Sequence, residues 1–162
     1  MSQIQTAFVE KSLVPDRARL EQAIGDLGFD LTIDEIYRPF DCSGFLPCVL
    51  KGRKSGFEIY FESLNEALRS FPRLKDEIGS RDCAINFRWG GDLAECACVL
   101  VVSAALAKSF GAVVHYQGND LLYSTDQLVG DARSALHASE SEFSPDPSAP
   151  LPQQKKPWWR IW

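Results

Sequence analysis

Between residues 82 and 110 the chain changes from an alternation of apolar and polar residues to an almost unbroken apolar run. The alternation over Cys83–Trp89 predicts a strand with one polar face. From Cys96 to Ala107 only Ser103 is not apolar, and a helix that is hydrophobic on every side must be buried on every side. We therefore expect this helix to lie at the centre of the fold.

The ends of this central helix are also marked in the sequence. Asp92 stands three residues before Glu95, a spacing that is seen at capped helix starts. Gly111 is the residue type that commonly ends a helix. The helix is therefore expected to begin just after Asp92 and to end before Gly111.

A second alternation gives the clearest strand signal in the chain. Residues 56–62 place apolar side chains on one face and polar side chains on the other, so one face is expected to be buried and the other wet. The polar positions are Glu58, Tyr60 and Glu62. Residues 52–55 have the length and composition of a hairpin loop, which predicts that this strand pairs with an extended run over residues 45–51.

The other expected elements follow from shorter patterns. They are an amphipathic helix from Pro15 to Leu27, an extended stretch over Phe29–Tyr37, a short helix over Leu64–Phe71, a hairpin of Val113–Tyr116 with Leu121–Tyr123, and a final helix from Ser124 through Leu136. This order, with hairpins rather than strands spaced regularly by helices, argues for an α+β domain. We expect a mainly antiparallel sheet that is covered by the buried central helix and by flanking helices.

The composition of the chain changes after residue 138. Residues 139–162 hold five of the nine prolines together with serine, glutamine and acidic residues, which is typical of a mobile linker. We therefore divide the chain into a single α+β domain, residues 1–138, and a proline-rich flexible tail, residues 139–162.

The tail ends in a tryptophan-rich motif. Trp158, Trp159 and Trp162 are three of the four tryptophans of the chain, and they lie beside three cationic residues. Exposed tryptophans usually dock as anchors. A short patch with three charges would hold a membrane only weakly, so we expect these residues to contact a protein groove, of this chain or of a partner.

The formal net charge of −5 indicates which kind of partner the chain is expected to bind. An acidic domain is poorly matched to a phosphate backbone and better matched to a cationic partner, so nucleic-acid binding is not expected. The N-terminus lacks the pattern of a secretory signal, and the longest apolar run is too short to span a bilayer. The five cysteines are expected to be reduced thiols in a cytoplasmic protein.

Charged residues on the polar faces of the two alternating strands form the candidate site. If these strands pair, Glu58 and Glu62 come close to Arg88, Asp92 and Glu95. Such a cluster has three interpretations: acid–base or metal-assisted catalysis, a solvated face with cross-strand ion pairs, or a surface that receives basic groups of a protein partner. The cysteine and histidine spacings match no ligand set, so no metal or cofactor is expected.

Three segments resemble a family of small bacterial proteins: Gly44–Cys48, Ser55–Phe61 and Asp82–Gly111. The ending Lys155–Trp162 is similar to the tails of small proteobacterial proteins. Single-domain acidic α+β proteins of this kind are similar to immunity proteins, which neutralise toxins delivered by contact-dependent or type VI secretion systems. The resemblance implies a protein that works by occlusion, and it carries over no active-site residue.

We therefore expect a non-catalytic protein-binding domain, an immunity protein that covers a cognate bacterial toxin with an acidic face. The residues expected to bind the partner are Glu58, Tyr60, Glu62, Arg88, Asp92, Trp158, Trp159 and Trp162. Two alternatives stay open: a small hydrolase or metal-dependent enzyme that uses the Glu, Arg and Asp cluster, and an adaptor recruited through its tryptophan-rich tail.

Overall fold

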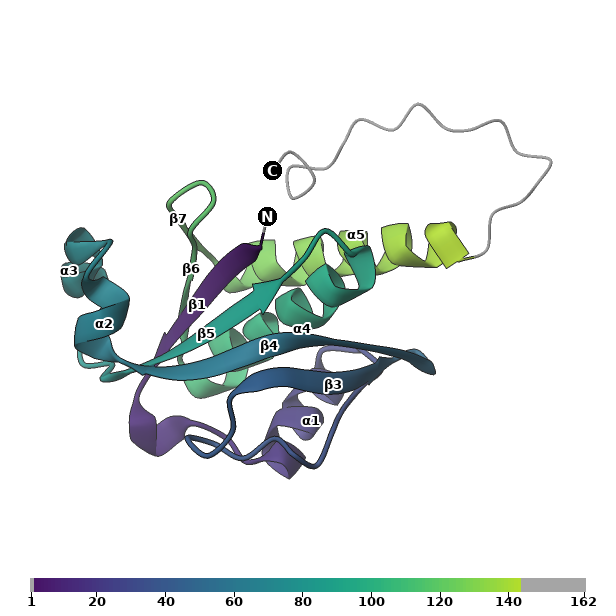
Figure 1. Ribbon diagram of the computed structural model, residues 1–162, viewed down its shortest axis with the longest axis horizontal. Helices are drawn as coiled ribbons and strands as arrows, with labels where there is room; N and C mark the ends of the chain where they lie inside the picture. Colours follow the sequence, from purple (N-terminus) through teal and green to yellow (C-terminus); the bar gives the residue numbers. More distant parts are fainter. Residues whose placement is uncertain (1, 144–162) are drawn as a thin grey trace.

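The computed structural model describes residues 2–143, which form seven strands and five α-helices (Figure 1). The strands are β1 (Gln3–Val9), β2 (Leu31–Ile33), β3 (Gly44–Leu50), β4 (Arg53–Ser63), β5 (Cys83–Trp89), β6 (Val113–Tyr116) and β7 (Leu121–Tyr123). The α-helices are α1 (Arg17–Asp26), α2 (Leu64–Leu68), α3 (Lys75–Ile78), α4 (Leu93–Phe110) and α5 (Thr125–Phe143). Two short 3₁₀ helices are η1 (Lys11–Leu13) and η2 (Pro72–Leu74).

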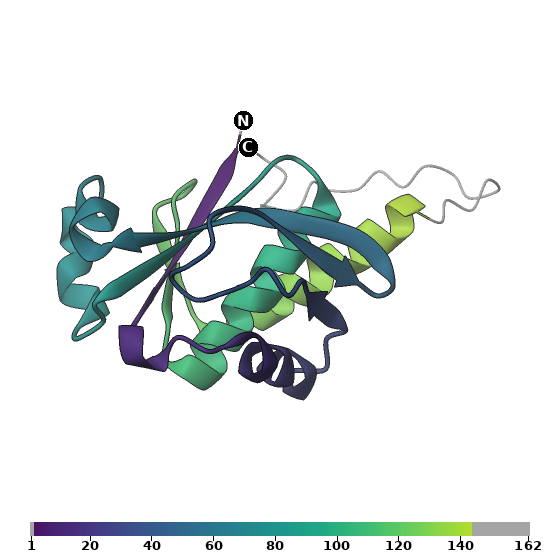
Figure 2. The same ribbon diagram turned by 60° about the horizontal axis from the view of Figure 1, so that its bottom comes forward.

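All seven strands belong to one antiparallel sheet with the order β2-β3-β4-β5-β1-β6-β7. Helices α1, α4 and α5 lie together on one side of this sheet (Figure 2). The expected α+β fold, with an antiparallel sheet covered by a buried helix and flanking helices, is confirmed.

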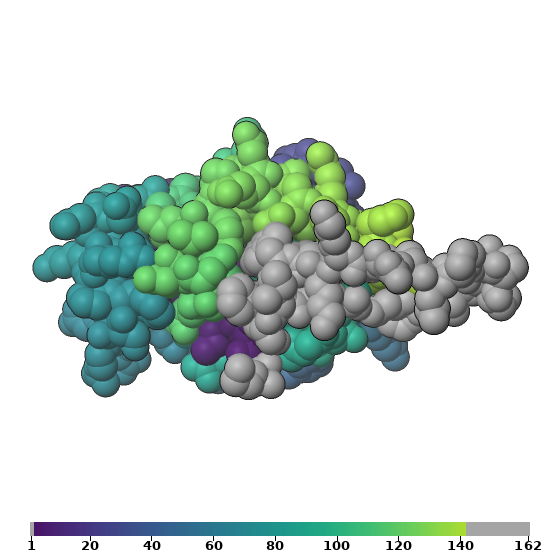
Figure 3. All heavy atoms as spheres, turned by 90° about the horizontal axis from the view of Figure 1, so that it is seen from above, coloured from purple at the N-terminus to yellow at the C-terminus, as the bar shows by residue number. Residues whose placement is uncertain are grey.

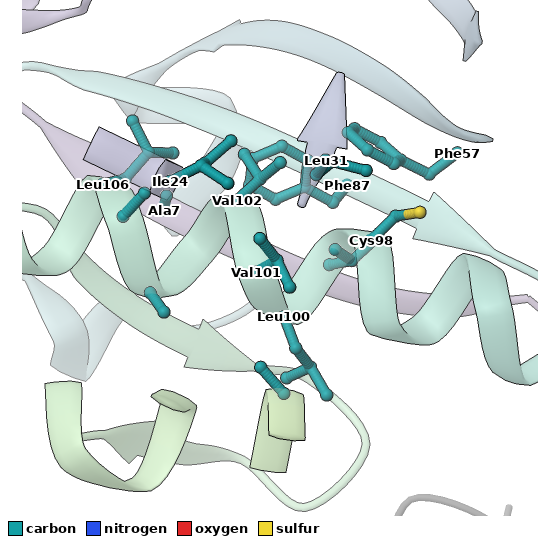
Figure 4. Packing of buried hydrophobic residues seen from close by; sticks show 14 of the residues in the cluster. Ala7, Ile24, Leu31, Phe57, Phe87, Cys98, Leu100, Val101, Val102 and Leu106 are labelled. Atoms are coloured by element: carbon teal, nitrogen blue, oxygen red, sulfur yellow. The ribbon is translucent and has the colours of Figure 1, made fainter. Parts of the chain in front are cut away.

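Helix α4 is enclosed by the sheet on one side and by α1 and α5 on the others. Every residue from Cys96 to Leu106 is buried. Figure 4 shows Val102 and Leu106 pointing toward the sheet and Leu100 pointing to the opposite side of the helix. Each fully buried valine or leucine contributes about 1.5–3 kcal/mol relative to exposure, so this helix supplies a large part of the driving force for folding.

Both ends of α4 agree with the sequence expectation. The Asp92 side chain accepts a hydrogen bond from the backbone N–H of Glu95 at 3.0 Å, and Gly111 adopts the left-handed conformation with φ 72°. By length and composition alone α4 would also pass as a membrane-spanning helix, but most of it is buried inside the fold, as in the core helix of a soluble protein.

Strand β1 is the element that the sequence pattern did not predict, although it lies between β5 and β6 inside the sheet. Its core-facing positions include Gln3 and Gln5, so the sequence lacks the alternation of apolar and polar residues that would have predicted a strand. The amide nitrogen of Gln5 donates to the Ser103 hydroxyl at 2.7 Å, and the amide oxygen of Gln3 accepts from the Tyr116 hydroxyl. The partners of these buried groups come from distant parts of the chain, while the amide oxygen of Gln5 has no partner among the described residues.

The extended stretch and the end of the final helix also differ from expectation. Of the predicted stretch Phe29–Tyr37 only β2 is a strand, because a turn with a hydrogen bond from the Tyr37 N–H to the Asp34 carbonyl follows it. Helix α5 continues past residue 138 as far as Phe143. A hydrogen bond of 2.7 Å from the Lys51 ammonium to the Glu140 carboxylate ties this extra length to the β3–β4 hairpin. Residues 144–162 lie outside the described residues.

The face of the sheet opposite α1, α4 and α5 is called the outer face below. The segment from α2 to α3 covers one end of it, where Phe8, Leu74, Ile78 and Ala84 form a second, smaller core cluster. The rest of the outer face has no helix of the described chain over it (Figure 2).

Helix α1 closes the edge of the sheet at β2. The Arg17 side chain donates to the Ile33 carbonyl at 2.6 Å, and the Glu21 carboxylate accepts from the Ile33 N–H at 2.9 Å. These are the backbone groups of an edge strand that would otherwise be free to pair with another chain. The two side chains also form an ion pair at 3.4 Å, which holds both in place.

We expect the double substitution Arg17→Ala with Glu21→Ala to raise self-association, because it frees one N–H and one C=O at the β2 edge. Leaving these partly buried groups unpaired is also expected to lower the free energy of unfolding by about 1–3 kcal/mol. Light scattering over a concentration series and urea unfolding measure the two effects. The control is Gln22→Ala with Asp26→Ala, two exposed residues of the same helix. Equal self-association of both variants and the unchanged protein contradicts the edge-blocking role.

Candidate functional site

A row of side chains crosses four strands on the open part of the outer face. Phe45 of β3 lies opposite Glu58 of β4. Arg88 of β5 is the next partner of Glu58, and Ile4 of β1 is the next partner of Arg88. The expected pairing of the two alternating strands is therefore present, and it places Glu58 beside Arg88. We call these four residues the outer row.

Tyr60 connects the two charges of the outer row. Its hydroxyl donates to the Glu58 carboxylate at 2.6 Å, and its ring centroid lies 5.2 Å from the centre of the Arg88 guanidinium. No ion pair joins Glu58 to Arg88 within residues 2–143, although the two residues are direct cross-strand partners. The Arg88 Nε atom is buried and has no hydrogen-bond acceptor there. The Tyr60 side chain thus contacts both charged groups.

Two of the remaining acidic residues of the predicted cluster form other hydrogen bonds, although Glu95 also lines the groove beside Phe45. Asp92 caps α4, and the Glu95 carboxylate accepts from the Gly90 N–H at 3.1 Å, so both serve the start of the helix. Glu62 lies on the outer face opposite Ala84, toward the end that α2 covers. Among the described residues no group of three histidine, cysteine or acidic side chains is placed to hold a metal ion.

Apolar side chains border the outer row on β3. Phe45 is 56% exposed and Val49 is 39% exposed, and both lie on the same face of β3 because they are four residues apart. A side chain at Gly56 would come within 2.5 Å of the Phe45 ring, so the ring lies over this glycine. A groove of about 810 Å³ is lined by Phe45, Val49 and Pro47 among others. The surface therefore combines an apolar strip with the charges of the outer row.

The sequence interpretation missed the role of Phe45 although a signal was present. The run over residues 45–50 is apolar at every position, so a strand there must either be buried on both faces or expose apolar side chains. The structure shows the second outcome: Leu46, Cys48 and Leu50 are buried, while Phe45 and Val49 are exposed.

A second polar cluster joins the β6–β7 hairpin to the segment from α2 to α3, and Figure 3 shows these two segments side by side. The buried His115 ring contacts the Asp120 carboxylate at 2.8 Å, and the same carboxylate pairs with Arg73 at 2.6 Å. Phe71 packs against the His115 ring at a centroid distance of 4.6 Å. These contacts fix the hairpin against the chain before α3, so His115 is a buried residue with a partner. The cluster is best explained as structural.

The other predicted site residues add little to this surface. Each of the five cysteines is free, and four of them are buried. Trp158, Trp159 and Trp162 lie outside the described residues, so their predicted contact with a partner stays a prediction.

The link between Glu58 and Tyr60 can be tested by titration. The hydrogen bond to Glu58, with burial and the Glu58 charge, raises the pKa of Tyr60 above its ordinary value of 10.0, and Arg88 acts in the opposite direction. We expect Glu58→Gln to lower the Tyr60 pKa and Arg88→Gln to raise it further. Carbon NMR of labelled tyrosine rings measures both shifts, with Glu62→Gln as the control. A Tyr60 pKa that is unchanged in Glu58→Gln contradicts the hydrogen bond.

The buried histidine predicts an acid-sensitive fold. Burial lowers the pKa of His115 below its ordinary value of 6.5, and the hydrogen bond to Asp120 opposes this shift. The imidazole of His115 therefore takes up a proton more readily in the unfolded chain than in the folded chain. The free energy of unfolding falls as the pH drops below about 6.5. We expect His115→Gln to flatten this dependence in urea unfolding, and Asp120→Asn to lower the His115 pKa further by NMR.

The matched control is His137→Gln, which shows whether loss of any histidine has the same effect on the pH profile. A His115 pKa at or above 6.5 would contradict the dominance of burial.

No protein-family model, no curated protein and no solved structure matches this chain. The comparisons therefore assign neither a family nor a function. Any function of the outer face is therefore inferred from the positions and chemistry of its side chains.

Proposed function

We propose that this chain is a non-catalytic protein-binding domain, an immunity protein that neutralises a cognate bacterial toxin by covering it with the outer face. The observation that carries the proposal is the open outer face, where exposed Phe45 lies in one row with Glu58 and Arg88 beside Tyr60. Aromatic residues and arginine are the residue types that most often anchor protein interfaces.

The apolar part of this surface supports a protein partner. Phe45 and Val49 expose large apolar side chains beside a groove, and contact with a complementary surface would remove them from water. The anchors stand on β3, a strand held within a seven-stranded sheet. Because a sheet position is already ordered, little conformational entropy is lost when the partner binds.

The charge of the chain supports a cationic partner. The net charge is −5, and Glu58 adds a carboxylate to the open part of the outer face, with Glu62 farther along the same strand toward the covered end. Complementary charge mainly raises the rate of association and disfavours wrong partners. A toxin with a basic active-site rim, such as one that acts on a polyanion, has the matching charge.

The free thiols agree with a cytoplasmic site of action in this proposal. All five cysteines are unpaired, and structural disulfides are rare where the cytosol keeps thiols reduced. A toxin that enters a neighbouring cell would meet the protein in that compartment.

The test is to co-express the chain with each reading frame next to its gene in the source bacterium and to measure survival and complex formation. We expect one product that is toxic alone, that the chain neutralises, and that it binds in a stoichiometric complex. Phe45→Ala should weaken binding about 30-fold, the effect of a 2 kcal/mol anchor. Glu58→Lys with Glu62→Lys should mainly slow association.

The matched control is Glu77→Lys, which changes the charge at an exposed position of α3 away from the open part of the outer face. If no neighbouring product binds the chain, or if outer-face variants bind and protect as well as the unchanged protein, the proposal is wrong.

A further inference from the structure

Arg88 carries donors that the described chain leaves unused. Its guanidinium has five N–H groups, and none of them forms a hydrogen bond or ion pair within residues 2–143. The Nε atom is buried, so water does not replace the missing acceptor. The terminal nitrogens are not among the buried unpaired atoms, so an acceptor supplied from outside can pair with their N–H groups.

The neighbouring carboxylates are all engaged with other donors. Glu58, the direct cross-strand partner of Arg88, accepts from the Tyr60 hydroxyl. Asp92 accepts from the backbone at the start of α4, and Glu95 accepts from the Gly90 N–H. The missing acceptor of Arg88 is therefore not supplied by the acidic residues nearest to it in the sheet and in the sequence.

The surroundings of Arg88 favour a carboxylate over a phosphate. The guanidinium is held over the Tyr60 ring, and a planar fork of N–H donors matches the two oxygens of a carboxylate. The adjacent Glu58 and the net charge of −5 repel a doubly charged phosphate more strongly than a singly charged carboxylate. Ile4 and the exposed Phe45 complete the row on either side, which suits an acidic residue that has apolar neighbours.

We propose that Arg88, positioned by Tyr60, receives an aspartate or glutamate carboxylate of the bound protein. This inference rests on the proposed protein-binding function and adds to it the chemistry of one contact. The partner surface then presents an acidic residue to Arg88 inside a basic surrounding that faces Glu58 and Glu62. A partner with a uniformly basic surface would give the N–H donors of Arg88 no acceptor and would bind less tightly.

The test selects peptides from a random library against the full chain and keeps those whose binding shifts the NMR signals of Glu58 and Arg88. We expect the selected sequences to share one acidic position. Replacing that residue by its amide should weaken binding about 10- to 100-fold, as for a charged hydrogen bond. This change leaves the protein itself untouched, so it is informative even if an Arg88 variant folds poorly.

Variants of the protein then locate the contact. On Arg88→Gln the acidic peptide and its amide should bind equally, and Arg88→Lys should recover only part of the difference, because a lysine provides a point charge and no planar fork. The matched control is Arg69→Gln, an exposed arginine after α2, which should preserve the full difference.

Two outcomes overturn the inference, and they differ in whether the protein-binding proposal is also refuted. Peptides that bind the outer face without needing an acidic residue, or whose acidic residue matters equally on Arg88→Gln, refute the carboxylate contact and leave the protein-binding proposal intact. A selection in which no peptide shifts Glu58 or Arg88 counts against both.

Discussion

Helix α4 has no polar side, so the chain must surround it on all sides, and most of the architecture follows from this need. The sheet covers one side of α4, while α1 and α5 cover the others. The single hydroxyl in its apolar run, on Ser103, is met by the Gln5 side chain of β1. A polar residue in this interior strand is therefore tolerated because the helix offers its amide nitrogen a partner. The same contact explains why β1 belongs to the core although two of its core-facing residues are glutamines.

The enclosure of α4 also determines which surface is left for binding. The three long helices are all used on one face of the sheet, and the short segment from α2 to α3 reaches only one end of the other face. The middle of the sheet thus presents side chains from strands that are far apart in the sequence, in a row set by strand register. Such a surface is ordered before it meets a partner, which favours recognition by shape and by a few well-placed anchors.

Charge on this face is organised by Tyr60. Its hydroxyl donates to Glu58 and its ring lies against Arg88, and these two opposite charges form no ion pair with each other among the described residues. The outer face therefore presents the Glu58 carboxylate as an acceptor and the Arg88 guanidinium as a donor, and each can contact a different group of a partner. The carboxylates of Asp92 and Glu95, by contrast, accept backbone hydrogen bonds at the start of α4.

The sequence by itself determined the elements whose patterns are local. The unbroken apolar run predicted the buried helix, Asp92 and Gly111 marked its ends, and the alternation over residues 56–62 predicted which side of β4 would be wet. Tertiary structure alone decided the position of β1, because Gln3 and Gln5 look exposed until Tyr116 and Ser103 pair with them. It also decided that Phe45 stays exposed, since an apolar strand is buried on both faces only if a second layer covers it. Long-range pairing, which no local pattern encodes, decided that Glu58 and Arg88 meet while Asp92 turns to the helix.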